Sequence, residues 1–130
     1  MSSWTQIGSD INGEATGDQS GYSISLSSNG SVVAIGARDN TNTDSVTGSN
    51  KPSSGHVRVY QYNTGDDTWD KIGNDIDGEA ANDQSGNSVS LSSDGSVVAI
   101  GAHRNDGNDT NQTSRGHLRV YQYNTGDDTW

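Results

Sequence analysis

Apolar residues lie in short runs separated by Gly, Asn, Asp and Ser, and no stretch has the apolar spacing of an amphipathic helix. Residues 22–27 alternate between polar and apolar side chains, which predicts a strand with two different faces. Residues 32–37 begin with consecutive apolar residues, which predicts a strand buried on both faces. An Asn-Gly pair between these runs predicts a tight hairpin. After a long polar loop at residues 38–54, residues 56–62 and 69–76 predict a third and a fourth strand.

The same pattern occurs twice along the chain, about 65 residues apart, which is typical of repeat architectures. Residues 4–11 are the twin of the fourth strand, and residues 117–123 are the twin of the third. Residues 120–130 repeat residues 59–69 without change. Each copy therefore predicts a meander of four antiparallel strands, and such units around an axis form the blades of a β-propeller. We expect an all-β chain with two propeller blades; a β-sandwich and an up-and-down barrel are the alternatives.

Composition and charge limit the partners of this chain. Leu, Ile, Val and Phe make up only about 15% of the residues, which leans toward disorder, but their clustering in strand-length runs favours a folded domain. The formal net charge is −10 and no basic cluster occurs, so we expect neither a nucleic-acid partner nor binding to an anionic membrane. No apolar stretch reaches the roughly 20 residues of a membrane span, and no signal peptide is visible.

There is no cysteine, which excludes disulfides and cysteine-based metal sites. Cysteine content does not fix the compartment. The richness in Asp, Asn, Ser, Thr and Gly suits an extracellular or cell-surface protein.

Both copies carry a series of glycines, a valine-rich strand and a tryptophan in the same order. The first copy has Gly-Asp-Gln-Ser-Gly at residues 17–21, Val-Ala-Ile-Gly-Ala at 33–37, Gly-His-Val-Arg-Val-Tyr at 55–60, and Trp69. This series resembles the FG-GAP repeats of integrin α-subunit heads and of many bacterial surface proteins. The resemblance covers essentially the whole chain and implies a β-propeller.

The chain departs from the FG-GAP pattern in three respects. Ser20 and Ser85 stand where the family has Phe, and Arg38 and His103 stand where it has Pro. The family's calcium loop lies between the first two strands, where this chain has only a tight hairpin. That hairpin has too few carboxylates to supply the six or more oxygen ligands that calcium prefers. We therefore expect no calcium site there.

The order of the strands predicts how the units associate. Residues 1–130 form one unit, in which residues 4–11 are an outer strand, residues 12–76 are blade 1, and residues 77–130 are blade 2 without its outer strand. Propellers have about four to eight blades, so two blades do not close a ring. We expect copies to close the ring head to tail, as a trimer with six blades or a tetramer with eight. The expected clasp between copies involves Trp4, Ile7, Ile11, Val120, Tyr121, Tyr123 and Trp130.

Several polar residues are candidates for chemistry, and each has a structural alternative. The oxygen-rich loops at residues 39–44 and 106–109 either bind calcium or are solvated turns, and their spacing fits no complete ligand set. His56 with Arg58, and His117 with Arg119, share strand faces and either line a ligand site or are hydrogen-bonded surface residues. Asp18 and Asp83 are interpreted as turn caps. Glu14 and Glu79 also repeat, but nothing in their spacing indicates that they work as a pair of catalytic carboxylates.

The aromatic residues also have two interpretations. These residues either pack between blades or form a platform on which sugars stack. They are Trp4, Trp69, Tyr60, Tyr62 and their twins. Asn-x-Thr motifs at residues 108–110 and 111–113 are glycan acceptors in a eukaryotic secretory setting. No Gly-x-Ser-x-Gly nucleophile motif occurs.

We therefore expect a non-catalytic propeller scaffold that assembles with copies of itself, with no catalytic residue, no metal and no cofactor. The near-identity of the repeats indicates a recent duplication, an engineered sequence or an excised repeat fragment. The alternative is an extracellular adhesion or lectin-like module that binds protein or glycan through the loops of one propeller face.

Overall fold

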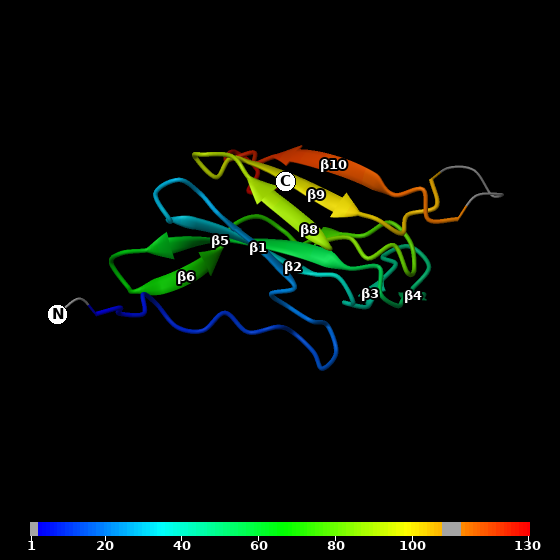
Figure 1. Ribbon diagram of the computed structural model, residues 1–130, viewed down its shortest axis with the longest axis horizontal. Coiled ribbons are helices and arrows are strands. Elements are labelled where there is room, and N and C mark those ends of the chain that lie inside the picture. Colours follow the sequence, from blue (N-terminus) through cyan, green and yellow to red (C-terminus); the bar gives the residue numbers. More distant parts are fainter. Residues whose placement is uncertain (1–2, 108–112) are drawn as a thin grey trace.

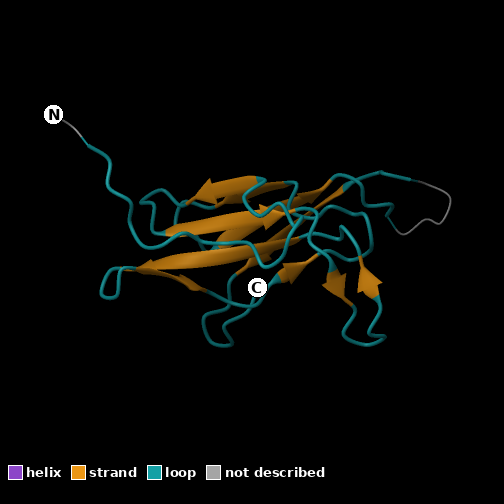
Figure 2. Ribbon diagram, turned by 90° about the horizontal axis from the view of Figure 1, so that it is seen from below, coloured by secondary structure: helices purple, strands orange, loops and turns teal. Residues whose placement is uncertain are grey.

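The computed structural model describes residues 3–107 and 113–130, and its regular elements are all β-strands (Figures 1 and 2). The first sheet has the order β1-β2-β5-β6, with β7 beside β5. Its strands are β1 (Ser23–Leu26), β2 (Val32–Ala37), β5 (His56–Asn63), β6 (Thr68–Lys71) and β7 (Ile76–Asp77). The second sheet has the order β10-β9-β8, with β8 (Ser88–Leu91), β9 (Val97–Ala102) and β10 (His117–Gln122). The prediction of an all-β chain with antiparallel sheets is confirmed.

The main strands lie where the hydrophobic pattern predicts them. β2 spans residues 32–37 as predicted, and β1, β5 and β10 differ from the predicted strands by one residue at their ends. The hairpin between β1 and β2 is stabilised by Asn29, whose Oδ1 accepts the backbone N–H of Ser31 at 3.0 Å. In the second copy Asp94 Oδ1 accepts the backbone N–H of Ser96 at 3.0 Å. This bond and those from the hydroxyls of Ser96 and Ser92 lower the pKa of Asp94 to about 2.

The predicted fourth strand is not continuous. β6 pairs with the last residues of β5 and β7 pairs with its first residues. Gly73 lies between them with a φ of +71°, a left-handed conformation that interrupts the pleat. In the single chain residues 4–11 adopt no strand, and the outer strand expected there in the blade of a neighbouring copy stays a prediction. A strand needs a neighbour with which to exchange backbone hydrogen bonds.

The loop at residues 38–54 is more ordered than its polar sequence predicts, because it contains the hairpin of β3 (Asn42–Thr43) and β4 (Asn50–Lys51). Asp44 closes this hairpin by accepting the backbone N–H groups of Val46 and Thr47, each at 2.9 Å. These bonds and the Lys51 ammonium, 3.2 Å away, hold the pKa of Asp44 far below its usual range. A side chain therefore sets the turn, without an apolar pattern.

The two larger sheets pack face to face, with β1 and β8 side by side (Figure 1). The Ser23 hydroxyl donates to Gly86 O at 2.7 Å, and Leu91 N donates to Ser25 Oγ at 3.0 Å. A Cβ atom at Gly36 would lie 2.1 Å from Gly86 O, so the close approach of the sheets requires glycine there. The core between the sheets consists of Val32, Ala34, Val57, Val59, Ile76, Val98 and Ile100.

Candidate functional site

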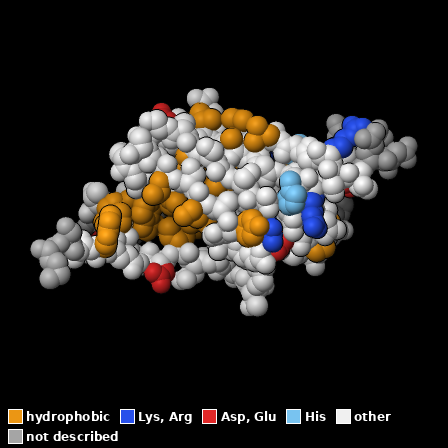
Figure 3. Space-filling model, in the orientation of Figure 1, with side chains coloured by type: hydrophobic (Ala, Val, Ile, Leu, Met, Phe, Trp, Pro, Cys, Tyr) orange, Lys and Arg blue, Asp and Glu red, His pale blue; other side chains and the backbone are white. Residues whose placement is uncertain are grey.

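Apolar side chains remain exposed on the outer faces of the sheet pair. Figure 3 shows them gathered over the first sheet beside the N-terminal segment, and again over β10. We call Trp4, Ile7, Ile24 and Leu26 the first-sheet surface, and Leu118 and Val120 the second-sheet surface. Contiguous exposed apolar surface of this kind marks an interaction site.

The second-sheet surface consists of the repeat twins of two core residues of the first sheet. Leu118 is the twin of Val57, and Val120 is the twin of Val59. Val57 and Val59 are 0% and 1% exposed because the second sheet covers them, whereas Leu118 and Val120 are 65% and 61% exposed. The difference in burial therefore comes from the neighbouring sheet.

The first-sheet surface contains the repeat twins of two residues with which the second sheet packs against the core. Ile24 and Leu26 are 65% and 57% exposed, whereas their twins, Val89 and Leu91, pack against the core. The two outer surfaces thus correspond to the two sides of the interface that already exists between the sheets.

The N-terminal segment is attached to the first sheet by two hydrogen bonds. Gly8 N donates to Asp67 Oδ1 at 2.8 Å, and Trp69 Nε1 donates to Ile7 O at 3.1 Å. In Figure 1 this segment, drawn in dark blue, runs beside the sheet without becoming a strand. The segment is positioned, but its own strand edges are not paired.

The same attachment recurs on the second sheet. Gly73 N donates to Asp128 Oδ1 at 2.7 Å, and Trp130 Nε1 donates to Ile72 O at 3.0 Å. The Tyr123 hydroxyl and the Gly73 N–H hold the pKa of Asp128 below its usual range. Residues 4–11 therefore contact the first sheet in the way that residues 69–76 contact the second sheet.

The edge of β10 is open. In the first sheet the equivalent strand, β5, pairs with β2 on one side and with β6 and β7 on the other. In the described part of the chain β10 pairs only with β9, and beyond it the chain makes a single bridge between Asn124 and Thr129. An edge of this kind is available to another strand.

The expected clasp residues fall into two groups. Trp4, Ile7 and Val120 are exposed, and Ile11 is partly buried. Tyr121 packs against the core, and the rings of Tyr123 and Trp130 pack together with centroids 5.1 Å apart. The side chains of these three residues make contacts within the chain, so around Tyr121 only the backbone edge of β10 faces outward.

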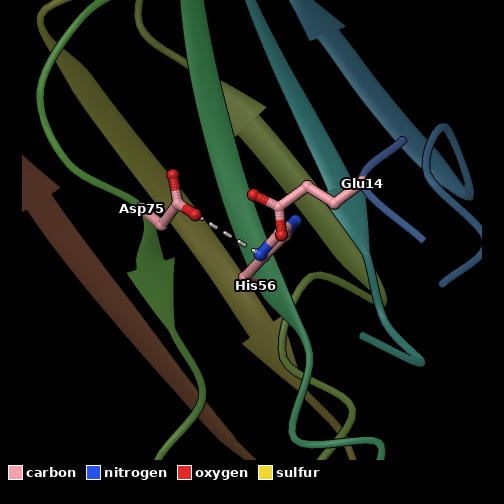
Figure 4. A group of neighbouring side chains, drawn as sticks. All are labelled: Glu14, His56 and Asp75. Carbon is pink, nitrogen blue, oxygen red and sulfur yellow. Dashed lines mark ion pairs between the residues drawn. The ribbon is translucent and has the colours of Figure 1, made fainter. Parts of the chain in front are cut away.

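Five ionisable side chains form a group around Arg58 and Asp75. We call this group the Arg58 cluster: Glu14, His56, Arg58, Lys71 and Asp75. Arg58 donates to both carboxylate oxygens of Asp75, at 3.1 and 3.0 Å, and also pairs with Glu14. Lys71 Nζ lies 2.6 Å from Asp75 Oδ1. Figure 4 shows His56 between Glu14 and Asp75, and His56 Nδ1 lies 3.8 Å from Asp75 Oδ2.

The Arg58 cluster is an ion-pair network. Burial lowers the pKa of His56, which favours its neutral form. Burial opposes ionisation of Asp75, but the hydrogen bond from Lys71 and the charge of Arg58 lower its pKa. Ligand atoms of Glu14, His56 and Asp75 lie within 4.8 Å of one another, a spacing that a metal ion could bridge. The Arg58 guanidinium already binds both carboxylates, and its charge opposes a cation there.

Asp18 and Asp83 have partners that the sequence interpretation missed. The amide of Asn40 donates to Asp18 at 2.7 Å, and the amide of Asn105 donates to Asp83 at 2.7 Å, with all four residues buried. The prediction of turn capping is incomplete, because these pairs tie each crossing segment to the loop after the second strand. The signal is an Asn that follows the Asp by 22 residues in both copies.

In the described parts of the two oxygen-rich loops, carboxylates accept hydrogen bonds from other groups of the protein. Asp39 accepts the amide of Gln84 at 2.8 Å, and Asp106 accepts the backbone N–H of Ser114 at 2.7 Å. Residues 108–112, which include most of the two glycan-acceptor motifs and the end of the second loop, lie outside the described residues.

Comparison with known families identifies the repeat. Residues 76–118 match the model of the FG-GAP repeat, as the sequence resemblance predicts for this part of the chain. The match runs from β7 through β8 and β9 into β10. No curated protein matches the chain. In the described residues no helix is long and apolar enough to cross a membrane.

Proposed function

We propose that this chain is a non-catalytic scaffold of two β-propeller blades that assembles head to tail with copies of itself into a closed ring. The second-sheet surface of one copy packs on the first-sheet surface of the next. Such a heterologous contact closes by rotation. Three copies make six blades and four copies make eight, both within the range of about four to eight that propellers use.

The observation that carries this proposal is the difference in burial between twin residues. The contact of the first sheet with the second is a complete example of the interface, and the open surfaces repeat its two sides. Burying Leu118 and Val120 as Val57 and Val59 are buried removes exposed apolar surface from water. The repeat equivalence of these surfaces therefore supports a second copy of this chain as the partner.

The backbone supports the same arrangement. β5 pairs Gln61 with Asp70 in the first sheet. The twin register pairs Gln122 of one copy with Thr5 of the next. Because the contacts of Ile7 and Gly8 already hold the N-terminal segment, adding it to β10 costs less conformational entropy than ordering a free tail.

Sedimentation over a series of protein concentrations tests the proposal. We expect the chain to sediment with three or four times its mass of 13.7 kDa. Leu118→Lys and Val120→Lys are expected to shift the distribution to the single chain, because a charge on the second-sheet surface would be buried without a partner.

Val46→Lys is the matched control. Val46 is also exposed, at 91%, but it lies in the turn between β3 and β4, away from both surfaces. This variant is expected to assemble as the unmodified chain does. A chain that sediments at 13.7 kDa at every concentration, or a Val46 variant that dissociates like the Val120 variant, contradicts the proposal.

A further inference from the structure

The Arg58 cluster has a second, incomplete copy on the second sheet. His117 and Arg119 take the places of His56 and Arg58, and Glu79 takes the place of Glu14. Arg119 pairs with Glu79 as Arg58 pairs with Glu14, and His117 Nδ1 lies 3.8 Å from Glu79. Lys71 and Asp75 have no counterpart on the second sheet, and the member that binds Arg58 is Asp75.

The repeat gives that member a counterpart at the other end of the chain. Asp75 lies six residues after Trp69, and Asp10 lies six residues after Trp4. Asp75 is held by Lys71, four residues before it, at 2.6 Å. Asp10 is held in the same way, because the amide of Gln6 donates to Asp10 Oδ1 at 2.9 Å. Asp10 thus repeats the contact that Asp75 makes with the residue four positions before it, and Asp10 is exposed.

Arg119 and His117 are correspondingly less covered. The Arg58 side chain is 19% exposed and that of Arg119 is 38% exposed. The His56 side chain is 5% exposed and that of His117 is 27% exposed. Where Arg58 donates to Asp75, Arg119 donates its Nη1 to the Tyr121 hydroxyl at 3.1 Å. A neutral hydroxyl is a weaker acceptor than a carboxylate.

We propose that Asp10 of one copy binds Arg119 of the neighbouring copy, so that each junction of the ring contains an ion-pair cluster completed by the partner. This inference rests on the proposed ring. The contact joins the N-terminal segment of one copy to β10 of another, so it fixes both the direction of assembly and the strand register. Gln6 replaces Lys71 at the junction, which leaves Arg119 as the cation shared by Asp10 and Glu79.

This sharing of one cation gives the variants a distinctive pattern. Asp10→Asn in the unmodified background removes a charge-assisted hydrogen bond and is expected to weaken association about fivefold to tenfold. Arg119→Gln leaves Asp10 and Glu79 facing each other without a cation and is expected to weaken association more. In the Arg119→Gln background, Asp10→Asn is expected to cause no further loss, because it removes a repulsion.

The experiment measures the association constants of the full chain and of these three variants by sedimentation, with urea unfolding as a check on folding. The matched control is Asp75→Asn, which breaks the internal cluster and is expected to lower the stability of the chain without changing the number of copies assembled. If the unmodified chain does not associate, the ring itself is refuted. If it associates and Asp10→Asn has no effect, or has the same effect in both backgrounds, the ring stands and the Asp10–Arg119 pair is refuted.

Discussion

Val59 and Val120 occupy the same strand position in the two sheets, so replacing each with Ala separates burial within the chain from burial between copies. Val59 is 1% exposed and Val120 is 61% exposed. Deleting two methyl groups costs about 1.6 kcal/mol of transfer free energy at a buried site, and the cavity adds to this. Val59→Ala is therefore expected to lower the free energy of unfolding by about 2 to 3 kcal/mol.

Val120→Ala is expected to behave differently in the isolated chain. About two fifths of Val120 is covered, so the same deletion costs about 0.6 kcal/mol there and leaves no closed cavity. In the ring Val120 is buried as Val59 is, and the cost rises to about 2 kcal/mol at each junction. The increase of about 1.4 kcal/mol over the isolated chain lowers the association constant of the junction by about tenfold.

Urea unfolding followed by circular dichroism measures both costs, at the lowest usable protein concentration and at one about a hundredfold higher. The loss of stability caused by Val59→Ala is expected to be equal at the two concentrations. The loss caused by Val120→Ala is expected to grow with concentration. A small loss for Val120→Ala that does not change with concentration would refute the reasoning, as would a loss equal to that of Val59→Ala in the dilute chain.

Three further predictions concern the single chain. Asp18→Ala leaves the buried amide of Asn40 without its acceptor and is expected to lower the free energy of unfolding by about 1 to 3 kcal/mol; a loss in urea unfolding below about 0.5 kcal/mol contradicts this. Because burial lowers the pKa of His56, the unfolded chain binds its proton more readily, so stability is expected to fall as the pH drops below about 6.5. His56→Gln should remove that slope in unfolding measured from pH 7.5 to 5.5, and an unchanged slope argues against it. Gly73→Ala is expected to cost at least about 1 to 2 kcal/mol through its φ of +71° and to displace the Trp130 indole, whose Cδ1 would lie 2.5 Å from the new Cβ; an unchanged indole N–H resonance contradicts the contact.

The sequence predicts the main strands well because apolar runs and tight turns determine them locally. β2 coincides with its predicted bounds, since its apolar residues fit only a buried strand. The hairpin of β3 and β4 is missed because the Asp44 carboxylate and its backbone partners form it, without any apolar alternation. Residues 4–11 share the sequence pattern of a strand, but whether they form one depends on a partner strand and not on local preference.

Only those features of the candidate site that follow from aligning the two copies could be predicted from the sequence. Alignment of the copies identifies the twins, such as Val59 and Val120, but not the neighbour that buries one of them. The expected clasp includes both Val120 and Tyr121, and consecutive strand residues point to opposite faces. Tyr121 pairs in register with buried Val98 and packs inward, which leaves Val120 outward. The sequence pairs His56 with Arg58 but does not place Lys71 and Asp75 beside them, because these residues come from separate segments.

Disulfide trapping tests the head-to-tail ring most directly, because the chain has no cysteine of its own. The register of β5 with β6 pairs Gln61 with Asp70, so Thr5→Cys and Gln122→Cys in one chain are expected to face each other across the junction between copies. Under mild oxidation the account predicts a covalent ladder that ends at three or four chains. The control pair, Gln6→Cys with Gln122→Cys, is out of register by one residue and should cross-link far less. Oxidised protein that remains monomeric, or equal cross-linking by the two pairs, would contradict the account.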